Sequence, residues 1–450
     1  MRKSFRLSLL AAAMAAVFSP GASALDGAWR GDLAFGGTKI PLVFNFSENE
    51  EGKTSCTLDS PSQGAKGIPA TVLLCTADSV SLECTAIGAK FNGKISDDII
   101  NGNFSQRGFA FPLELKQDAP IGERRPQTPK PPYPYTVIDT VFTAPDGIVL
   151  AGTITMPVTD KKKKVPAVVM ITGSGAQNRD EEIFDHKPFA VIADYLARNG
   201  VASLRYDDRG TGKSQGDFRS GTTCTFEGDA RNAVKFMRSI SGIGKTGVLG
   251  HSEGGTIAFL LGADKVPDFI ISLAGMAVTG KETLMEQNER ALAKAGIAGA
   301  DKDNCLKVIS SLFDEIAKQG NSGISTTINV DSLAMAAGVS VPPMLLASIK
   351  STQKVRTPWF DKFVGLDPGE YIKKIKCPVL AINGEKDTQV KALTNLAVIR
   401  KFCPKAEVKA MPGLNHLMQH AQTGDMAEYD EIRETISPEV LEIILNFVRN

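Results

Sequence analysis

The sequence predicts an α/β protein with a mostly parallel sheet and helices on both of its faces, preceded by a small all-β domain. Three observations support this prediction. Strand-like runs without a helical period fill residues 25–117, a proline-dense segment follows, and apolar strands alternate with amphipathic helices from Tyr135 onward. With 450 residues, of which 42% are hydrophobic, the chain is long enough for two domains with real cores.

The first 24 residues have the pattern of a secretory signal peptide. Basic residues precede an apolar run from Leu7 to Phe18, and the small residues of Ala22-Ser23-Ala24 suit cleavage. The apolar run is shorter than the roughly 20 residues that cross a bilayer, so no membrane span is expected here or later. We therefore expect an exported protein, either periplasmic or extracellular.

The charge balance argues against one class of partner, and the cysteines bear on disulfides and metal binding. The 51 basic residues nearly balance the 50 acidic ones, so the basic footprint of a nucleic-acid-binding protein is missing. Export permits disulfides, and Cys75 and Cys84 lie on neighbouring strand-like runs where they could pair across a hairpin. The odd total of seven cysteines leaves a free thiol, and the lack of a CxxC pair argues against a zinc site.

The first domain, residues 25–117, is expected to be a small antiparallel sandwich or barrel. Its runs, such as "IPLVFNF", "TVLLCTA" and "FAFPLEL", are separated by Asn and Gly clusters. Six prolines then lie between Pro120 and Pro134, and such density resists helix and sheet alike. Residues 118–134 are therefore predicted to be a stiff, extended linker.

The second domain, residues 135–450, is predicted to contain the parallel sheet. The strand "PAVVMIT" is followed by a helix whose apolar residues share one face, namely Phe189, Ile192, Ala193 and Leu196. The strands "VASLRYD", "KTGVLGH", "DFIISLAG", "CPVLAING" and "AEVKAMPG" continue the alternation. A closing helix turns five residues inward, namely Val440, Ile443, Ile444, Phe447 and Val448.

The alternation lapses between about residues 276 and 371, where the runs are helix-like. Because this segment is inserted between two core strands, we expect it to form a cap over the site. Phe360, Trp359, Met344 and Met285 are candidates to line a pocket in the cap, although apolar residues at helical spacing are more often ordinary core.

Two glycine-rich runs imitate nucleotide sites. In "DDRGTGKSQG", a phosphate-binding loop would need a glycine where Asp207 stands, and a carboxylate would repel a phosphate. In "GSGAQN", Asn178 replaces the third glycine of the dinucleotide fingerprint, and charged residues follow it. We instead expect Asp207 and Arg209 to form a buried charge pair that braces the loop, with Lys213 facing solvent.

A third glycine motif, "GHSEGG", points to covalent catalysis. It fits the GxSxG nucleophile elbow, with Ser252 between Gly250 and Gly254, and it lies between a strand and a helix as that motif requires. Small residues flank the serine because larger side chains would clash with neighbouring strands. Ser252 is therefore the predicted nucleophile, and the alternative is a glycine-rich turn with an idle serine.

A serine nucleophile needs a base, and the chain has four histidines. His251 adjoins the nucleophile and is interpreted as structural, and His186 as a cap or pocket residue. His416 follows the last strand, where the base is expected after the serine and the acid in chain order. His420, four residues further on, is the alternative.

The acid and the oxyanion donors follow from the same logic. The penultimate strand is followed by "EKD", so Asp387 is the predicted acid and Glu385 the alternative. One oxyanion donor is expected to be the backbone N–H of Glu253. The other is expected in the loop "TGSGAQ", from Ser174 or, second, Gly175.

Five runs together resemble the α/β-hydrolase superfamily, in particular secreted EstD-type carboxylesterases: "TGSGAQNRDE", "RYDDRGTGKSQGDF", "GHSEGG", "NGEKDTQV" and "LNHLMQH". The resemblance covers about residues 134–450 and implies an α/β-hydrolase fold with a helical cap insertion. It also implies Ser252, Asp387 and His416 as the catalytic triad, the same residues that the order of strands and loops indicates. The β-domain is similar to the extra domain of some family members.

These features predict a serine hydrolase that cleaves carboxylic esters through an acyl-enzyme and needs no metal or organic cofactor. The expected substrate is a small-molecule or glycan-borne ester, with short-chain or aryl groups. One alternative is a peptidase or acyl-thioester hydrolase with the same triad, although the β-domain is too short for the propeller of oligopeptidases. The other is a non-catalytic glycan-binding protein, against which the complete triad argues. No feature of the sequence indicates an oligomeric state.

Overall fold

The computed structural model describes residues 25–35, 38–48, 53–63, 65–118, 121–158, 164–323 and 325–450. The expected signal peptide, residues 1–24, therefore lies outside the described residues. The chain divides into two compact units, Met1–Pro120 and Ile121–Asn450, each described here by itself. Within the described residues, no helix combines the length and the apolar character that crossing a membrane requires.

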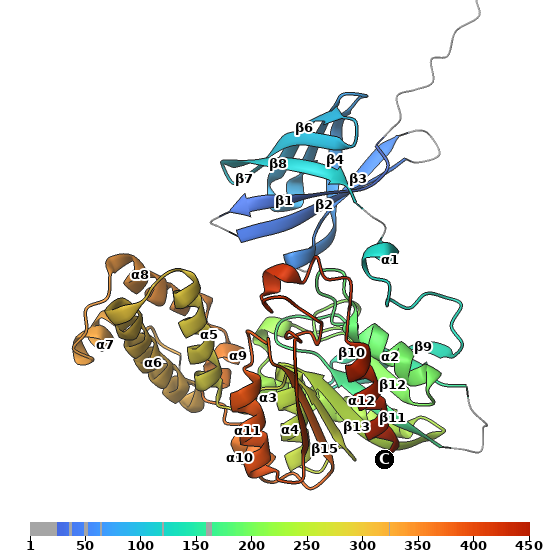
Figure 1. The fold of residues 1–450 in the computed structure, drawn as a ribbon, viewed down its shortest axis with the longest axis vertical. Coiled ribbons are helices and arrows are strands. Elements are labelled where there is room, and N and C mark those ends of the chain that lie inside the picture. Colours follow the sequence, from blue (N-terminus) through green and yellow to red (C-terminus); the bar gives the residue numbers. More distant parts are fainter. Residues whose placement is uncertain are drawn as a thin grey trace, which may run out of the picture. The chain divides into compact units, whose positions relative to one another are not determined.

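The first unit is a closed barrel of antiparallel strands in chain order (Figure 1). It closes where β1 pairs with β8, at Trp29 opposite Gln117 and Arg30 opposite Lys116. Of the predicted alternatives, a sandwich and a barrel, the structure shows the barrel. Closure leaves the sheet without free edges. The strands are β1 (Gly27–Phe35), β2 (Thr38–Glu48), β3 (Thr54–Ser60), β4 (Ala65–Cys75), β5 (Ser79–Cys84), β6 (Ala89–Ser96), β7 (Ile99–Gln106) and β8 (Phe109–Gln117).

The disulfide that Cys75 and Cys84 could have formed is absent, because all seven cysteines are free thiols. Cys75 of β4 lies opposite Val80, whereas Cys84 ends β5 and lies opposite Ala89 of β6. Cys84 lies four residue steps along the strand from Val80, which is about 13 Å at the usual rise of a strand. A disulfide joins Cα atoms that are roughly 4.4–6.8 Å apart, so the register of this hairpin forbids the pair.

Most of the predicted stiff, extended linker, residues 118–134, is not separate from the second domain, because its residues from Ile121 onward belong to the second unit. It begins with the short helix α1 (Ile121–Arg124). The Arg125 side chain is 1% exposed and donates hydrogen bonds to the carbonyl oxygens of Phe184 and Asp430, at 2.8 and 2.7 Å. These bonds attach the segment to loops of the α/β unit.

The second unit is built on an eight-stranded sheet in the order β16-β15-β14-β13-β11-β12-β10-β9. Strands β11 to β16 are parallel, and β10 pairs antiparallel with β9 and β12. The predicted α/β-hydrolase fold is confirmed. The strands are β9 (Thr136–Thr143), β10 (Val149–Met156), β11 (Val165–Ile171), β12 (Ala202–Tyr206), β13 (Ile243–His251), β14 (Ile270–Leu273), β15 (Val379–Gly384) and β16 (Glu407–Met411).

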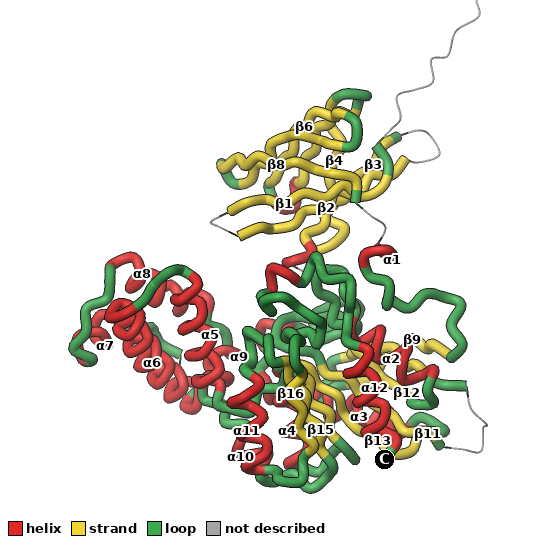
Figure 2. The backbone as a smooth tube through the Cα atoms, in the orientation of Figure 1, coloured by secondary structure: helices red, strands yellow, loops and turns green. Residues whose placement is uncertain are grey.

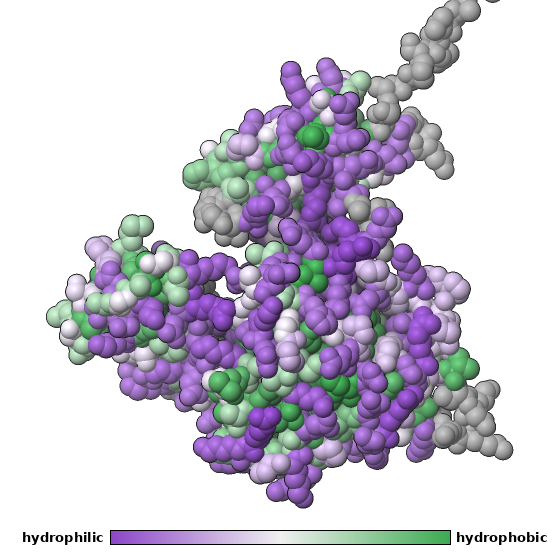
Figure 3. Space-filling view, in the orientation of Figure 1, coloured by the Kyte–Doolittle hydropathy of each residue, from purple (hydrophilic) through white to green (hydrophobic). Residues whose placement is uncertain are grey.

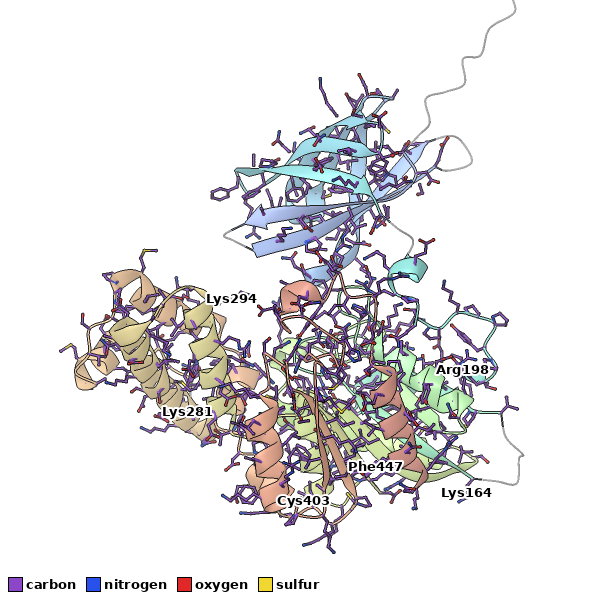
Figure 4. All side chains as sticks on the ribbon, viewed as in Figure 1. Lys164, Arg198, Lys281, Lys294, Cys403 and Phe447 are labelled. Atoms are coloured by element: carbon purple, nitrogen blue, oxygen red, sulfur yellow. The ribbon has the colours of Figure 1, made fainter. Side chains whose placement is uncertain are left out.

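Helices cover both faces of this sheet. On β11, Val169 and Ile171 pack with α3, α4 and α11, whereas Val168 and Met170 pack with α2 and α12 on the opposite face. The residues predicted to face inward on α2 and α12 all lie in this second cluster, including Phe447, which Figure 4 labels. The helices are α2 (Pro188–Arg198), α3 (Thr223–Ser239), α4 (Glu253–Ala263), α11 (Ala392–Phe402) and α12 (Pro438–Arg449).

Between β14 and β15 the chain forms a helical insertion at the place where a cap was predicted, called the cap below; among its described residues it contains helices but no strand (Figure 2). The ammonium of Lys281 on α5 lies 2.7 Å from the carboxylate of Asp314 on α6. At the end of the cap that carries α7 and α8, Met335 and Met344 are 80% and 86% exposed, and apolar surface is visible there in Figure 3. The helices are α5 (Gly280–Lys294), α6 (Gly299–Ser322), α7 (Val330–Ala336), α8 (Pro343–Ser351), α9 (Pro358–Val364) and, before β15, α10 (Gly369–Ile372).

His186 connects two loops of the α/β unit. Its Nε2 lies 2.9 Å from the carbonyl oxygen of Tyr429 and its Nδ1 lies 3.0 Å from the hydroxyl of Thr435. A neutral ring satisfies both contacts, because Nε2–H donates to the carbonyl and Nδ1 accepts from the hydroxyl. Burial, aided by the charge of Arg125, lowers the pKa of His186 to about 4. The folded protein therefore holds a neutral histidine that an unfolded chain would protonate near pH 6.5.

We expect this histidine to destabilise the fold on acidification. Between pH 6.5 and 4 the unfolded chain binds a proton that the folded chain does not, so the unfolding free energy falls as the pH falls, by about 3 kcal/mol in all. Denaturant unfolding at several pH values should show this slope in the wild type and not in His186→Gln. The exposed His420 supplies a matched control, His420→Gln. Equal slopes in wild type and His186→Gln would contradict the prediction.

Candidate active site

Ser252 lies at the sharp turn between β13 and α4. Its φ of +52° and ψ of −117° are a combination that residues other than glycine rarely adopt. The neighbouring glycines make the turn possible: a Cβ on Gly250 would lie 1.9 Å from the carbonyl oxygen of Gly254, and one on Gly254 would lie 2.1 Å from that of Ile171. The local geometry is that of a nucleophile elbow, with the serine at the carboxyl end of its strand.

The structure brings His416 and Asp387 together. The Nδ1 atom of His416 is 2.7 Å from the Oδ2 atom of Asp387, and both residues are buried. The Oδ1 atom of Asp387 accepts hydrogen bonds from the backbone N–H groups of Gln389 and Val390, each at 2.8 Å. Because Nδ1–H is committed to the carboxylate, Nε2 is the nitrogen that can accept a proton.

The alternative base and acid lie outside this pair. His420 is exposed and contacts Glu434, with 2.9 Å between Nδ1 and Oε1. Glu385 is exposed as well. Among the described residues no hydrogen bond joins the Ser252 hydroxyl to His416, and such bonds commonly tighten only when a substrate is bound.

His251, the residue before Ser252, connects the elbow to the loop of His416. Its Nε2 lies 2.9 Å from the backbone oxygen of His416, and its Nδ1 lies 2.9 Å from Glu181 Oε1. A carbonyl oxygen and a carboxylate both accept, so both ring nitrogens of His251 donate and the ring is an imidazolium. Burial opposes this charge, but the Glu181 carboxylate and the carbonyl of His416 raise the pKa of His251 above its usual value. The structural role predicted for His251 is therefore that of a buried cation.

Glu181 extends this connection to the loop after β11. Its Oε1 also accepts the backbone N–H of Gly173 at 2.7 Å, and a Cβ on Gly173 would lie 3.2 Å from the Cβ of Ser252. One buried ion pair, Glu181 with His251, thus contacts the loop of the expected oxyanion donors, the nucleophile elbow and the loop of the histidine. Glu181, which lies in the charged run after "GSGAQN", was not predicted to have a role in the site.

We expect Glu181→Gln to lower the unfolding free energy by about 3 kcal/mol, because the His251 imidazolium would lose its buried counter-charge. The looser contacts should also lower kcat for an ester more than they raise KM. Chemical denaturation and steady-state kinetics measure the two effects. Glu182→Gln is the matched control, since the adjacent carboxylate makes a weaker, less buried pair with Lys187 at 3.8 Å. Equal stabilities of the two variants would contradict the role of the pair.

The expected oxyanion donors are the residue after Ser252 and the two residues that follow Gly173, which lies next to Ser252. Because the N–H of Gly173 donates to Glu181, it is committed, whereas the backbone N–H groups of Ser174, Gly175 and Glu253 have no acceptor among the described residues. Glu253 begins α4, where the helix dipole is positive. Gly175 has a φ of +96°, a conformation that favours glycine. These N–H groups are thus available to a substrate oxygen.

The side chain of Glu253 makes contacts that the sequence did not predict. Its Oε1 accepts hydrogen bonds from the Thr223 hydroxyl of α3 at 2.6 Å and from the Trp359 indole of α9 at 2.7 Å. Burial raises the pKa of Glu253, and the two hydrogen bonds oppose that change. The cap helix α9 is thereby joined to the first residue of the nucleophile helix.

The expected pair of Asp207 with Arg209 is wrong. Asp207 instead accepts hydrogen bonds from Arg179, with 2.7 Å between Oδ2 and Nη2, and Arg209 binds Asp229, with 2.8 Å between Nε and Oδ2. Each arginine therefore pairs with an aspartate on another segment of the chain and not within its own loop. Lys213 is exposed, as predicted.

Asp208 attaches the same turn to the loop after β11. Its Oδ1 accepts the Thr172 hydroxyl at 2.8 Å and its Oδ2 accepts the backbone N–H of Gln177 at 2.9 Å. Burial, together with the carboxylates of Glu181 and Glu253, raises the pKa of Asp208 to about 8 against these hydrogen bonds. The run "DDRGTGKSQG" therefore braces the loop that carries Ser174 and Gly175.

The chain is similar in sequence to a curated esterase and more distantly similar to solved structures. Over 278 residues the chain is 28% identical to Esterase EstD of Thermotoga maritima, in an alignment that covers 60% of this chain and 58% of that protein; the chain thus spans little more than half of this curated relative. A solved esterase of Pyrococcus furiosus has 17% identity and a TM-score of 0.43, covering 70% of this chain and 91% of that one. An α/β-hydrolase of Penicillium sp. sh18 has 19% identity and a TM-score of 0.44, covering 70% and 98%.

The match to Esterase EstD confirms the resemblance to EstD-type enzymes that the sequence motifs indicated. A family model also matches, over residues 146–413, which is more than half of the 450 residues. Its description is X-Pro dipeptidyl-peptidase (S15 family). The matched region contains the β-strands of the sheet from β10 onward, the nucleophile elbow and the whole cap. The chain therefore belongs to the X-Pro dipeptidyl-peptidase (S15) family.

Proposed function

We propose that this protein is a serine hydrolase that cleaves carboxylic esters through an acyl-enzyme. The observation that carries the proposal is the strained elbow of Ser252 beside the buried pair of His416 and Asp387, whose Nδ1 to Oδ2 distance is 2.7 Å. Few other chemistries use a serine on such a turn with an imidazole whose tautomer a carboxylate sets. The similarity to Esterase EstD supports esters as the substrate class.

In the proposed reaction, the Ser252 hydroxyl attacks the ester carbonyl while His416 Nε2 takes its proton. The tetrahedral oxyanion accepts hydrogen bonds from the backbone N–H groups of Glu253 and of Ser174 or Gly175. His416 then gives the proton to the departing alcohol, which leaves an acyl-Ser252. Water, deprotonated by the same histidine, releases the acid and restores the enzyme. Asp387 holds the Nδ1–H tautomer throughout and stabilises the imidazolium.

A peptidase is the second candidate, because the matching family is described as X-Pro dipeptidyl-peptidase. A dipeptidyl-peptidase must bind the free ammonium of its substrate, for which a carboxylate near the serine is the natural partner. The carboxyl groups of Glu181, Asp208 and Glu253, which belong to the elbow and the loops that contact it, are buried and already accept hydrogen bonds from protein groups. This arrangement favours esters over peptides with a free amino terminus.

One experiment tests the proposal and separates the two candidates. The wild-type protein is treated with a fluorophosphonate, and the labelled peptide is mapped, with p-nitrophenyl acetate and alanyl-prolyl-p-nitroanilide assayed in parallel. We expect label on Ser252 and turnover of the ester only. Label on another residue would refute the assignment of the nucleophile, and turnover of the anilide alone would establish the peptidase.

A further inference from the structure

The cap contains a cavity of about 440 Å³ that lies between α5, α6, α8 and α9. Its walls are mainly aliphatic and aromatic side chains, among them Leu284, Leu292, Phe313, Leu345 and Phe360. In the part of the chain that the structure describes, no charged residue lines it. Of the residues that the sequence proposed for a pocket, Phe360 lines this cavity, whereas Met344 is exposed at the end of the cap.

The size and the lining of this cavity are those of a binding site. Small-molecule pockets usually have about 300–1,000 Å³, and an apolar cavity of only about 150 Å³ stays dry and binds benzene. Its polar lining residues, Asn288, Ser348 and Thr352, carry no charge. An occupant gains free energy from burying apolar surface, and a charged group would lose its hydration without a partner.

The cavity and the proposed active site are connected through neighbouring residues of the cap helices. On α9, Phe360 lines the cavity while its neighbour Trp359 donates a hydrogen bond to Glu253, the residue after Ser252. Leu284 lines the cavity too and packs against the cluster that contains Val390. The backbone N–H of Val390 donates to Asp387, at 2.8 Å. The cap therefore holds an apolar compartment next to the residues that hold the catalytic groups.

We propose that this cavity binds an unbranched, uncharged aliphatic chain, and that the chain is the acyl or alkyl substituent of the ester substrate. The assignment of the chain to the ester substrate rests on the proposed function, whereas the binding of an aliphatic chain does not. The proposal adds longer aliphatic esters to the short-chain and aryl esters that the sequence suggested. The cavity discriminates by chain length, because each methylene that it buries adds to affinity until the space is full.

Binding can be measured without turnover. Using Ser252→Ala protein, titration calorimetry with 1-butanol, 1-hexanol, 1-octanol and 1-decanol should give dissociation constants that fall about fourfold per methylene and then level off. Binding should carry a negative heat-capacity change, the mark of apolar burial. If 1-decanol does not bind, or binds no more tightly than 1-butanol, the site does not exist.

Filling variants locate the ligand. Ser348→Trp on α8 and Ala291→Phe on α5 place bulk at two walls of the cavity, and each should weaken 1-decanol at least tenfold. Ala347→Trp and Ala293→Phe make the same changes on the same helices at exposed positions outside the lining, and should leave binding unchanged. Equal effects of filling and control variants, with thermal melting unchanged, would place the ligand elsewhere and overturn the proposal.

Steady-state kinetics test whether the bound aliphatic chain is part of the ester substrate. In otherwise wild-type protein, the filling variants should raise KM for p-nitrophenyl decanoate at least tenfold and leave p-nitrophenyl acetate unchanged. If 1-decanol binds in the cavity but decanoate kinetics do not change, the site takes a separate apolar molecule and the assignment to the substrate is overturned. Loss of ester turnover in the wild type would refute the proposed function, while the alcohol titrations would still decide whether the site exists.

Discussion

Replacement of Ser252 by alanine is expected to lower kcat for p-nitrophenyl acetate by about a millionfold, close to the loss seen when a triad nucleophile is removed elsewhere. The hydroxyl is the group that forms the acyl-enzyme, and no neighbouring side chain replaces it: His251 is committed to Glu181 and to the backbone of His416. Fluorophosphonate labelling should vanish as well. Steady-state kinetics and labelling of purified Ser252→Ala measure both effects.

Stability measurements on the same residue separate catalysis from folding. Alanine keeps the Cβ that makes φ +52° and ψ −117° costly, so Ser252→Ala should unfold like the wild type. Glycine removes that Cβ, so Ser252→Gly should be equally inactive but more stable by about 1 kcal/mol. An alanine variant that retains activity within a hundredfold, or a glycine variant that is less stable than alanine, would contradict the strained-nucleophile interpretation.

The fold was readable from the sequence because its signals are local and repeated. Buried parallel strands appear as continuous apolar runs. The residues predicted to form the apolar faces of α2 and α12 are the ones that pack in the core. Closure of the barrel was not readable, because it depends on the pairing of β1 with β8, two strands at opposite ends of that unit. The free thiols of Cys75 and Cys84 depend in the same way on strand register, which the spacing of cysteines does not reveal.

The candidate site likewise contains residues that local sequence signals predict and residues that they do not. Ser252, Asp387 and His416 could be predicted because each follows a core strand in a known chain order. The residues that position them escaped prediction because their partners lie far away in the sequence, as Glu181 does from His251 and Trp359 from Glu253. Partner choice among several charged residues was also misjudged at Asp207, where only the folded chain shows which arginine is within reach.

Replacement of Asp387 by asparagine is expected to lower kcat by about ten-thousandfold, the effect of supplying the wrong histidine tautomer. The structure fixes how the new amide would sit. Oδ1 accepts two backbone N–H groups, from Gln389 and Val390, so the amide oxygen must stay there and the NH₂ group must face His416 Nδ1. The imidazole would then present Nδ1 as an acceptor and carry its proton on Nε2, where it cannot take the proton of Ser252.

Glu385, the neighbouring acidic residue, provides a control for this prediction. Glu385→Gln neutralises the exposed carboxylate two residues away on the same loop, and it should leave kcat unchanged within about twofold because Glu385 lies outside the Asp387–His416 pair. KM for p-nitrophenyl acetate should change little in Asp387→Asn, because the lost interaction strengthens only as the imidazolium forms. A large loss in Glu385→Gln, or activity within tenfold of the wild type in Asp387→Asn, would transfer the orienting role to another carboxylate.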